Sequence, residues 1–152
     1  MTTRLAELTL RMASADDLAA LVALNQQLIE DQRYDNPLSP EGLRERMARW
    51  VAGAHAVALF ELDDEIAAYA VWRDDADGIY VRHFFVARSF RRSGLGRSAF
   101  GVLEERWRGR EVKLDVLLHN QRALDFWRAV GFGDYSLVLR KPEMPSGRKL
   151  SA

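Results

Sequence analysis

The chain has no cysteine among its 152 residues. This absence excludes a disulfide framework, a thiolate nucleophile and a cysteine-based metal site, and nothing else in the sequence implies a metal. No apolar run approaches the ~20 residues that a membrane-spanning helix needs, and the N-terminus lacks the charged-then-apolar layout of a signal peptide. We therefore expect a cytoplasmic protein without a membrane partner.

Neither sign of charge predominates, because 22 Lys and Arg residues balance 22 Asp and Glu residues. This balance argues against a broad nucleic-acid-binding surface, so we expect no nucleic-acid partner. A hydrophobic content of 48% in a chain of this length is typical of a single globular domain. We predict that this domain spans residues 1–140 and that residues 141–152 form a flexible C-terminal tail.

Apolar periodicity predicts the element order β-α-α-β-β-β-α-β-α-β, a mixed α/β domain with a mostly antiparallel first part. The predicted strands cover residues 6–13, 55–62, 65–72, 79–86, 112–119 and 135–140. Three helix starts carry local signals. They are Ser14 followed by Asp17, Ser39 followed by Pro40, and Asn120.

One stretch, VARSFRRSGLGRSAFGVL from Val86 to Leu103, concentrates arginine and glycine where a strand runs into a helix. The first amides of a helix have no internal partners, and the helix dipole adds partial positive charge there. Gly94 and Gly96 let these amides approach a bulky anion, and Arg91, Arg92 and Arg97 supply charge suited to phosphate. The alternative is a solvated basic loop made flexible by its glycines.

Two motifs give this stretch a more specific interpretation. The P-loop and full Rossmann patterns are absent, but Arg91–Gly96 reads R-x-x-G-x-G. The segment LDVLLHNQRALDFWRAVGF, residues 114–132, then combines a strand, an Asn and a short helix ending in Gly-Phe. Through both motifs and the element order, residues 4–140 resemble the GNAT superfamily of acetyl-CoA-dependent N-acetyltransferases. The resemblance implies a mixed, mostly antiparallel central sheet flanked by about four helices.

The resemblance also implies that acetyl-CoA is the co-substrate, and it favours a homodimer. The implied function is transfer of an acetyl group to a primary amine of a small molecule or amino acid, by direct attack in a ternary complex. The alternatives are a non-catalytic acyl-CoA-binding regulatory module and a protein or peptide N-acetyltransferase. The cofactor-binding residues implied by the family motifs are Phe84, Phe85, Val86, Arg91, Arg92, Ser93, Gly94, Leu95, Gly96, Arg97, Asn120 and Trp127.

The sequence does not single out one residue as the general base. Acetyl transfer needs a neutral amine, which a base can generate. Asp115, on the strand before Asn120, and His83, in the middle of its strand, are the two first candidates; Glu30 and Asp31 are two more. For each of these side chains, a structural hydrogen bond or ion pair is the alternative.

The acceptor-binding residues are predicted in the first helix and the fourth strand. They are Asn25, Glu30, Asp31 and Arg82. The alternative for Asn25 is a structural role in a half-buried position. The alternative for Arg82 is an ion pair with Asp115, Glu30 or Asp31. Because Arg82 and His83 are neighbours on one strand, we expect them on opposite faces of the sheet. Trp127 stands where many family members carry a tyrosine that protonates the leaving thiolate. The resemblance therefore does not identify a general acid in this chain.

Overall fold

The structure, a computed structural model, describes residues 7–32 and 38–143. Its strands form one sheet in the order β1-β2-β3-β4-β5, antiparallel except for the parallel pair β4 and β5. The strands are β1 Leu8–Met12, β2 His55–Leu62, β3 Glu65–Asp75, β4 Gly78–Val86 and β5 Val112–Leu114; the helices are α1 Leu18–Gln32, α2 Pro40–Ala52, α3 Leu95–Arg106 and α4 Gln121–Ala129. The predicted mixed α/β fold is confirmed.

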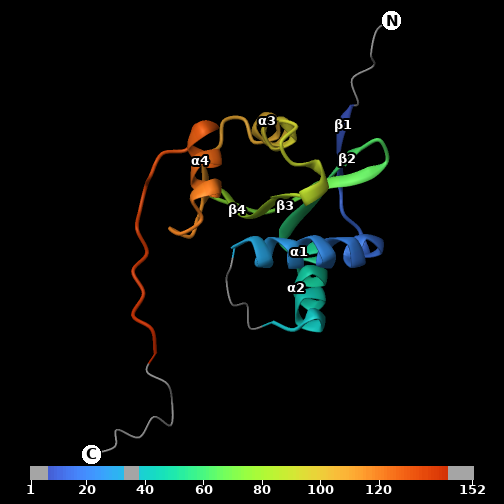
Figure 1. Cartoon of the computed structure of the whole chain (residues 1–152), viewed down its shortest axis with the longest axis horizontal. Coiled ribbons are helices and arrows are strands. Elements are labelled where there is room, and N and C mark those ends of the chain that lie inside the picture. The colour runs from blue at the N-terminus through green and yellow to red at the C-terminus, as the bar shows by residue number, and fades with distance from the viewer. Residues whose placement is uncertain (1–6, 33–37, 144–152) are drawn as a thin grey trace, which may run out of the picture.

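The sheet separates two hydrophobic cores (Figure 1). Helices α1 and α2 cover one face, where Leu21, Met47 and Tyr69 are fully buried. Helices α3 and α4 cover the other face, around Phe60 and Phe100. Because both faces are covered, the central strands β2, β3 and β4 carry apolar residues on both of their sides. Within the described ranges, no helix combines the length and apolarity needed to cross a membrane.

The predicted helix starts are formed by local side-chain hydrogen bonds. Ser39 accepts at Oγ from the amide of residue 42 at 3.1 Å, and Pro40 is the first residue of α2. Asn120 accepts at Oδ1 from the amide of residue 123 at 3.2 Å and caps α4. The carboxylate of Asp17 accepts from the backbone N–H of Ser14 at 2.8 Å. These starts depend on residues within four positions of one another, which is why sequence suffices to find them.

Two predicted strands differ in the structure. The strand expected at residues 112–119 is regular only over Val112–Leu114, after which the chain diverges from β4. The strand predicted at Tyr135–Arg140 is wrong: these residues are extended but join no ladder. They pair with no strand in the described part of the chain, and their side chains are exposed. The boundaries at residue 140 and in the tail stay predictions, since residues 1–6 and 144–152 lie outside the described ranges.

Arg82 and His83 do not lie on opposite faces, which corrects the expectation from simple alternation. The pairing of β3 with β4 shifts between Val71 and Trp72, whose partners are His83 and Val81, so Arg82 is the extra residue of a bulge. Both side chains consequently contact Trp50 of α2. The ring of His83 meets it edge-on at 5.1 Å, and the Arg82 guanidinium lies 5.6 Å from the ring centroid.

Candidate active site

The segment between β4 and α3 forms the predicted anion site. A single 3-10 turn, Arg88–Phe90, is followed by Arg92 and Gly94 in left-handed conformation, with φ of 67° and 77°, and α3 begins at Leu95. The amides of the first helical turn, Leu95–Arg97, precede the first i→i−4 bond, which Ser98 N–H makes to the Gly94 carbonyl at 3.1 Å. Three unpaired donors at the positive end of a helix therefore face one spot, an arrangement suited to phosphate.

The glycines of this loop are required for different reasons. Gly94 has a positive φ that L-residues rarely adopt, although its side-chain position is open. Gly96 has no such φ, but a Cβ there would lie 3.2 Å from Cε1 of Phe126 and 3.5 Å from Cγ2 of Val86. Gly96 thus allows α3 to approach α4 and β4 closely. Ser93, also predicted here, donates its hydroxyl to the Phe90 carbonyl at 2.8 Å and stabilises the turn.

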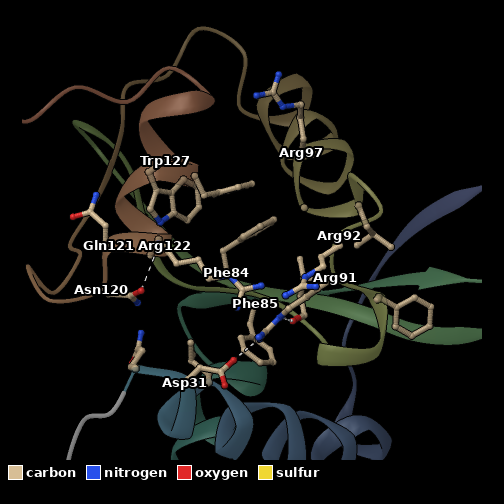
Figure 2. A pocket seen from close by; sticks show the side chains of 18 of the residues that line it. Asp31, Phe84, Phe85, Arg91, Arg92, Arg97, Asn120, Gln121, Arg122 and Trp127 are labelled. Carbon is tan, nitrogen blue, oxygen red and sulfur yellow. Dashed lines mark hydrogen bonds and ion pairs between the residues drawn. The ribbon is translucent and has the colours of Figure 1, made fainter.

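The arginines of the loop divide into two groups. Arg91 is held by the structure: it pairs with Asp31, donates from Nε to the Val86 carbonyl at 3.1 Å, and stacks over the Phe85 ring. Arg92 and Arg97 are exposed and line the pocket without an ion pair within the described residues, with Arg97 at its outer rim (Figure 2). Arg92 and Arg97 are therefore the side chains available to an anion.

The open edge of β4 forms the floor of the site. Because β5 pairs with β4 only as far as Val81, the edge from Arg82 to Val86 is left uncovered in the part of the chain described. Ala87 N–H donates to the Ala67 carbonyl of β3 at 2.8 Å. Since backbone groups alternate along an antiparallel strand, those of Val86 and Phe84 point to the opposite, open edge. Their N–H groups are donors for an extended ligand lying between β4 and α4.

The wall opposite α3 is formed by α4. Trp127, 9% exposed, packs against Phe84 at 5.5 Å and Phe100 at 5.1 Å between ring centroids. Phe84 also stacks on Phe126 at 5.9 Å, so the floor and this wall are one aromatic cluster. Figure 2 shows Asn120, Gln121 and Arg122 at the start of α4, and all three line the pocket. The Oδ1 atom of Asn120 caps the helix, which leaves its amide –NH₂ group to donate to a ligand.

The C-terminal end of α1 closes the cleft on its remaining side. Glu30 and Asp31 line the pocket and bind the arginines after β4: Arg88 donates to Glu30 at 2.7 Å and to Asp31 at 3.0 Å. Burial raises the pKa of Asp31, but the hydrogen bonds from Arg91 and Arg88 outweigh it and the net pKa lies below its usual value. The Asp31 carboxylate is therefore ionised at neutral pH and paired with both arginines.

The pocket enclosed by these elements has a volume of about 1000 Å³. This is large for a single small molecule and sufficient for the reactive arm of a cofactor together with an acceptor. Its loop end is cationic and its α1 end is acidic. Nowhere in the described ranges do three or more His, Asp or Glu side chains form a group that could hold a metal ion.

Ser93 and four other predicted residues lie outside this pocket. Asp115 is exposed and accepts a short hydrogen bond from the Tyr80 hydroxyl. Asn25 is 1% exposed and accepts from Arg46 at 3.2 Å, in agreement with a structural role. His83 is half-buried beside Trp50, with its Nδ1 atom 2.9 Å from the Tyr69 hydroxyl. Arg82 lies over Trp50 rather than pairing with Asp115, Glu30 or Asp31.

The environment of His83 disfavours protonation of its imidazole ring. Burial, and then the positive charges of Arg46 and Arg82, lower the pKa of His83 to about 3. The imidazole is neutral at pH 7 and surrounded by protein, so its contacts are those of a core residue.

His119 is a pocket residue that the sequence reasoning missed. It lines the cleft, and its Nε2 atom lies 2.7 Å from the backbone carbonyl oxygen of Gln32 at the end of α1. Gln121, Arg122 and Phe126 were missed as well. The available signal was position: His119 directly precedes the Asn of the second motif, where strand gives way to helix. Neither Tyr80 nor Tyr135 lines the pocket, so neither phenol stands in for the tyrosine that Trp127 replaces.

The cleft thus combines a helix start suited to phosphate with an open strand edge, in agreement with the acetyltransferase family that the sequence resembles. A model of the acetyltransferase (GNAT) family matches residues 22–132. The chain belongs to this family and is an acyltransferase.

Solved structures share the fold. A possible acetyltransferase from Clostridium difficile 630 is 15% identical, with a TM-score of 0.76 over 91% of this chain and 98% of that one. The aminoglycoside N-acetyltransferase AAC(6')-Iy in complex with CoA is 18% identical, with a TM-score of 0.73 over 94% and 99%. A predicted acetyltransferase with acetyl-CoA from Clostridium acetobutylicum is 14% identical, with a TM-score of 0.68 over 90% and 96%. The search of curated proteins found no match to this chain.

Proposed function

We propose that this protein transfers the acetyl group of acetyl-CoA to a primary amine of a small molecule, by direct attack within a ternary complex. One observation supports the proposal most strongly. A single cleft of about 1000 Å³ contains both the free amides at the start of α3 and the open edge of β4. The first suits a pyrophosphate, and the second suits the amide-containing pantetheine arm.

The residues present fit acetyl-CoA along the whole cleft. The amides of Leu95–Arg97 and the exposed guanidinium groups of Arg92 and Arg97 would hold the pyrophosphate. The backbone of Phe84 and Val86 and the side-chain amide of Asn120 would hold the pantetheine. When bound, the thioester supplies an activated acetyl carbon, and the backbone N–H group of Phe84 or Val86 would polarise its oxygen.

The acceptor would enter from the end of α1. The carboxylate oxygens of Glu30 and Asp31 there would accept hydrogen bonds from amino groups of the acceptor, although Arg88 and Arg91 balance the charge of the two carboxylates. Two structural neighbours are aminoglycoside acetyltransferases, AAC(6')-Iy and the soil metagenomic enzyme meta-AAC0020 in complex with sisomicin. Both are consistent with a small cationic acceptor, and an amino acid is the next candidate.

His119 is the proposed general base. As the acceptor nitrogen attacks the acetyl carbon, the carbon–sulfur bond breaks, the thiolate leaves with the electron pair, and the amine loses a proton. Histidine is the side chain best suited to take up a proton near neutral pH. Asp115 and His83 do not line the cleft, whereas His119 does.

The test is thiol release from acetyl-CoA over a panel of kanamycin, spermidine, lysine and glycine, paired with calorimetry of CoA binding. Turnover with a panel amine supports the proposal. Tight CoA binding without turnover over the whole panel would favour the alternative of an acyl-CoA-binding regulator, and turnover only with an added N-terminal peptide would favour a peptide acetyltransferase. The homodimer and the cytoplasmic location predicted from the sequence are tested by neither assay.

A further inference from the structure

The side chain of Arg91 runs from the open edge of β4 to the end of α1. Its Nε atom donates to the Val86 carbonyl at 3.1 Å, its Nη2 atom binds the Asp31 carboxylate, and its guanidinium lies 4.9 Å from the centroid of the Phe85 ring. Figure 2 shows the Arg91 guanidinium and the Asp31 carboxylate facing each other in the cleft. Only 20% of the Arg91 side chain is exposed, so three separate groups hold it in one position.

The Val86 carbonyl that Arg91 binds belongs to the open edge of β4. Val86 pairs with Ala68, and the next amide along β4, that of Ala87, donates to the Ala67 carbonyl at 2.8 Å. In an antiparallel ladder this pattern turns both backbone groups of Val86 away from β3, toward the side that β5 leaves uncovered. The Nε atom of Arg91 therefore binds the last carbonyl of the edge along which the pantetheine arm would lie.

The occupied carbonyl limits how an extended ligand can pair with β4. An N–H group of the arm would find its acceptor at the Phe84 carbonyl, two residues farther from the phosphate loop, because the Val86 carbonyl is already bound. Pairing at Val86 instead would shift the arm by about 6.6 Å and move the thioester relative to the donors of the edge. Arg91 thus favours one register of the arm on the strand.

Asp31 holds Arg91 in this position from α1. The oxygens of its carboxylate are divided between two arginines: Oδ2 accepts from Arg91, and Oδ1 accepts from Nη2 of Arg88 at 3.0 Å. Burial alone would raise the pKa of Asp31, but the hydrogen bonds from Arg91 and Arg88 lower it below its usual value. Glu30 forms its ion pair with Arg88 instead, and its side chain is 63% exposed against 30% for Asp31. Of the two carboxylates, Asp31 is the one that fixes Arg91.

We propose that Asp31 is a positioning residue for acetyl-CoA, which holds Arg91 on the Val86 carbonyl and so sets the register of the pantetheine arm on β4. This inference rests on the proposed function, because it concerns the same co-substrate in the same cleft. Arg91 acts here through the backbone of β4, and the exposed Arg92 and Arg97 are left to neutralise the phosphates. Asp31 thereby links the cofactor edge to the helix that borders the acceptor end of the cleft.

The first test is calorimetry of CoA binding to Asp31→Asn, with thermal melts to check folding. CoA is an anion, so the loss of a negative charge beside the cleft would by itself strengthen its binding. The loss of a positioning contact acts in the opposite direction, and we expect the dissociation constant to rise about 10-fold. Glu30→Gln is the matched control. It removes the same charge from the neighbouring residue and should strengthen CoA binding by up to about twofold.

The second test compares CoA with ADP, which has a pyrophosphate but no pantetheine arm. If Asp31 positions the arm, Asp31→Asn should weaken ADP binding by less than about twofold while it weakens CoA binding about 10-fold. A general loss of structure would weaken both. Arg91→Gln should reproduce this pattern. The double variant should bind CoA no more weakly than Arg91→Gln alone, because both substitutions break the same linkage.

Three results would overturn the inference and leave the proposed function intact. They are unchanged or tighter CoA binding in Asp31→Asn, equal losses for CoA and ADP, and additive losses in the double variant. The first would mean that Arg91 is a phosphate ligand that Asp31 restrains. A parent chain that binds no CoA would overturn the proposed function as well.

Discussion

His119 donates from Nε2 to the backbone carbonyl oxygen of Gln32 at 2.7 Å, joining the loop before α4 to the end of α1. A carbonyl oxygen only accepts hydrogen bonds, so the proton of the neutral imidazole is placed on Nε2. Nδ1 is then left with its lone pair, able to accept a proton. One contact between residues 87 positions apart thus closes a side of the cleft and selects the tautomer of a basic side chain.

His119→Asn should lower kcat about 100-fold at neutral pH, in the range that loss of a general base produces. The variant retains a side-chain donor for the Gln32 carbonyl but has no group to accept the proton. Its rate should rise with pH as more amine becomes neutral. Steady-state thiol release from pH 6 to 9 measures this, with CoA affinity by calorimetry expected to be unchanged. Unaltered kcat and pH profile would exclude His119 as the base.

Gly96→Glu should weaken acetyl-CoA binding by about 100-fold or more. The new side chain places a carboxylate among the amides that face the pyrophosphate, and its Cβ starts 3.2 Å from Phe126. Gly101→Ala, on the same helix with open space at its Cβ, is the control. It should leave binding unchanged and stabilise the protein by about 0.5–1 kcal/mol. Calorimetry and thermal melts measure both; retained affinity in Gly96→Glu would place the phosphates elsewhere.

The elements that sequence predicts correctly are those specified by nearby residues. The caps at Ser39 and Asn120 and the glycine loop before α3 each lie within a few positions, and all form as expected. Alternation also finds the strands of the sheet. It fails at Arg82, because a bulge depends on the register with β3, which one strand's sequence does not contain.

The site residues that sequence misses are set by long-range packing. His119 enters the cleft because the end of α1 lies beside the loop before α4, a contact between distant segments. Asp115 lies outside the cleft, where its carboxylate accepts a hydrogen bond from the Tyr80 hydroxyl. The segment at 135–140 has the apolar pattern of a strand, but that pattern does not specify which strand edge would pair with it.

Replacing Trp127 by Tyr should leave kcat no higher than replacing it by Phe. Both substitutions remove the same packing against Phe84 and Phe100 and should destabilise the protein by about 1–3 kcal/mol. The Tyr variant alone adds a phenol to the wall of the cleft. A thiol has a pKa of about 8.5 and leaves as a thiolate without an acid, so the phenol should give no advantage. A Tyr variant clearly faster than the Phe variant would show that protonation of the thiolate limits turnover.

His83 should make the protein lose stability as the pH falls below about 6.5. Burial, and then Arg46 and Arg82, lower its pKa from 6.5 to about 3. Between these values the unfolded chain binds a proton that the folded chain excludes, so the free energy of unfolding is unaffected above the unfolded pKa and decreases toward acid pH. One such group contributes at most about 1.4 kcal/mol per pH unit. Denaturant titrations at about pH 7, 6 and 5 measure the slope.

A matched pair of variants assigns that slope to His83. His83→Gln removes the titrating ring and should reduce the slope by about one proton, while His119→Gln, which removes an exposed histidine, should leave it nearly unchanged. His55, whose pKa burial also lowers, contributes in the same direction and accounts for a residual slope. The interval above about pH 4 avoids Asp17, whose pKa its hydrogen bonds from Arg11 lower to about 2. If His83→Gln keeps the full slope, His83 takes up its proton in the folded protein as readily as in the unfolded chain, and its packing against Trp50 and Tyr69 does not lower its pKa.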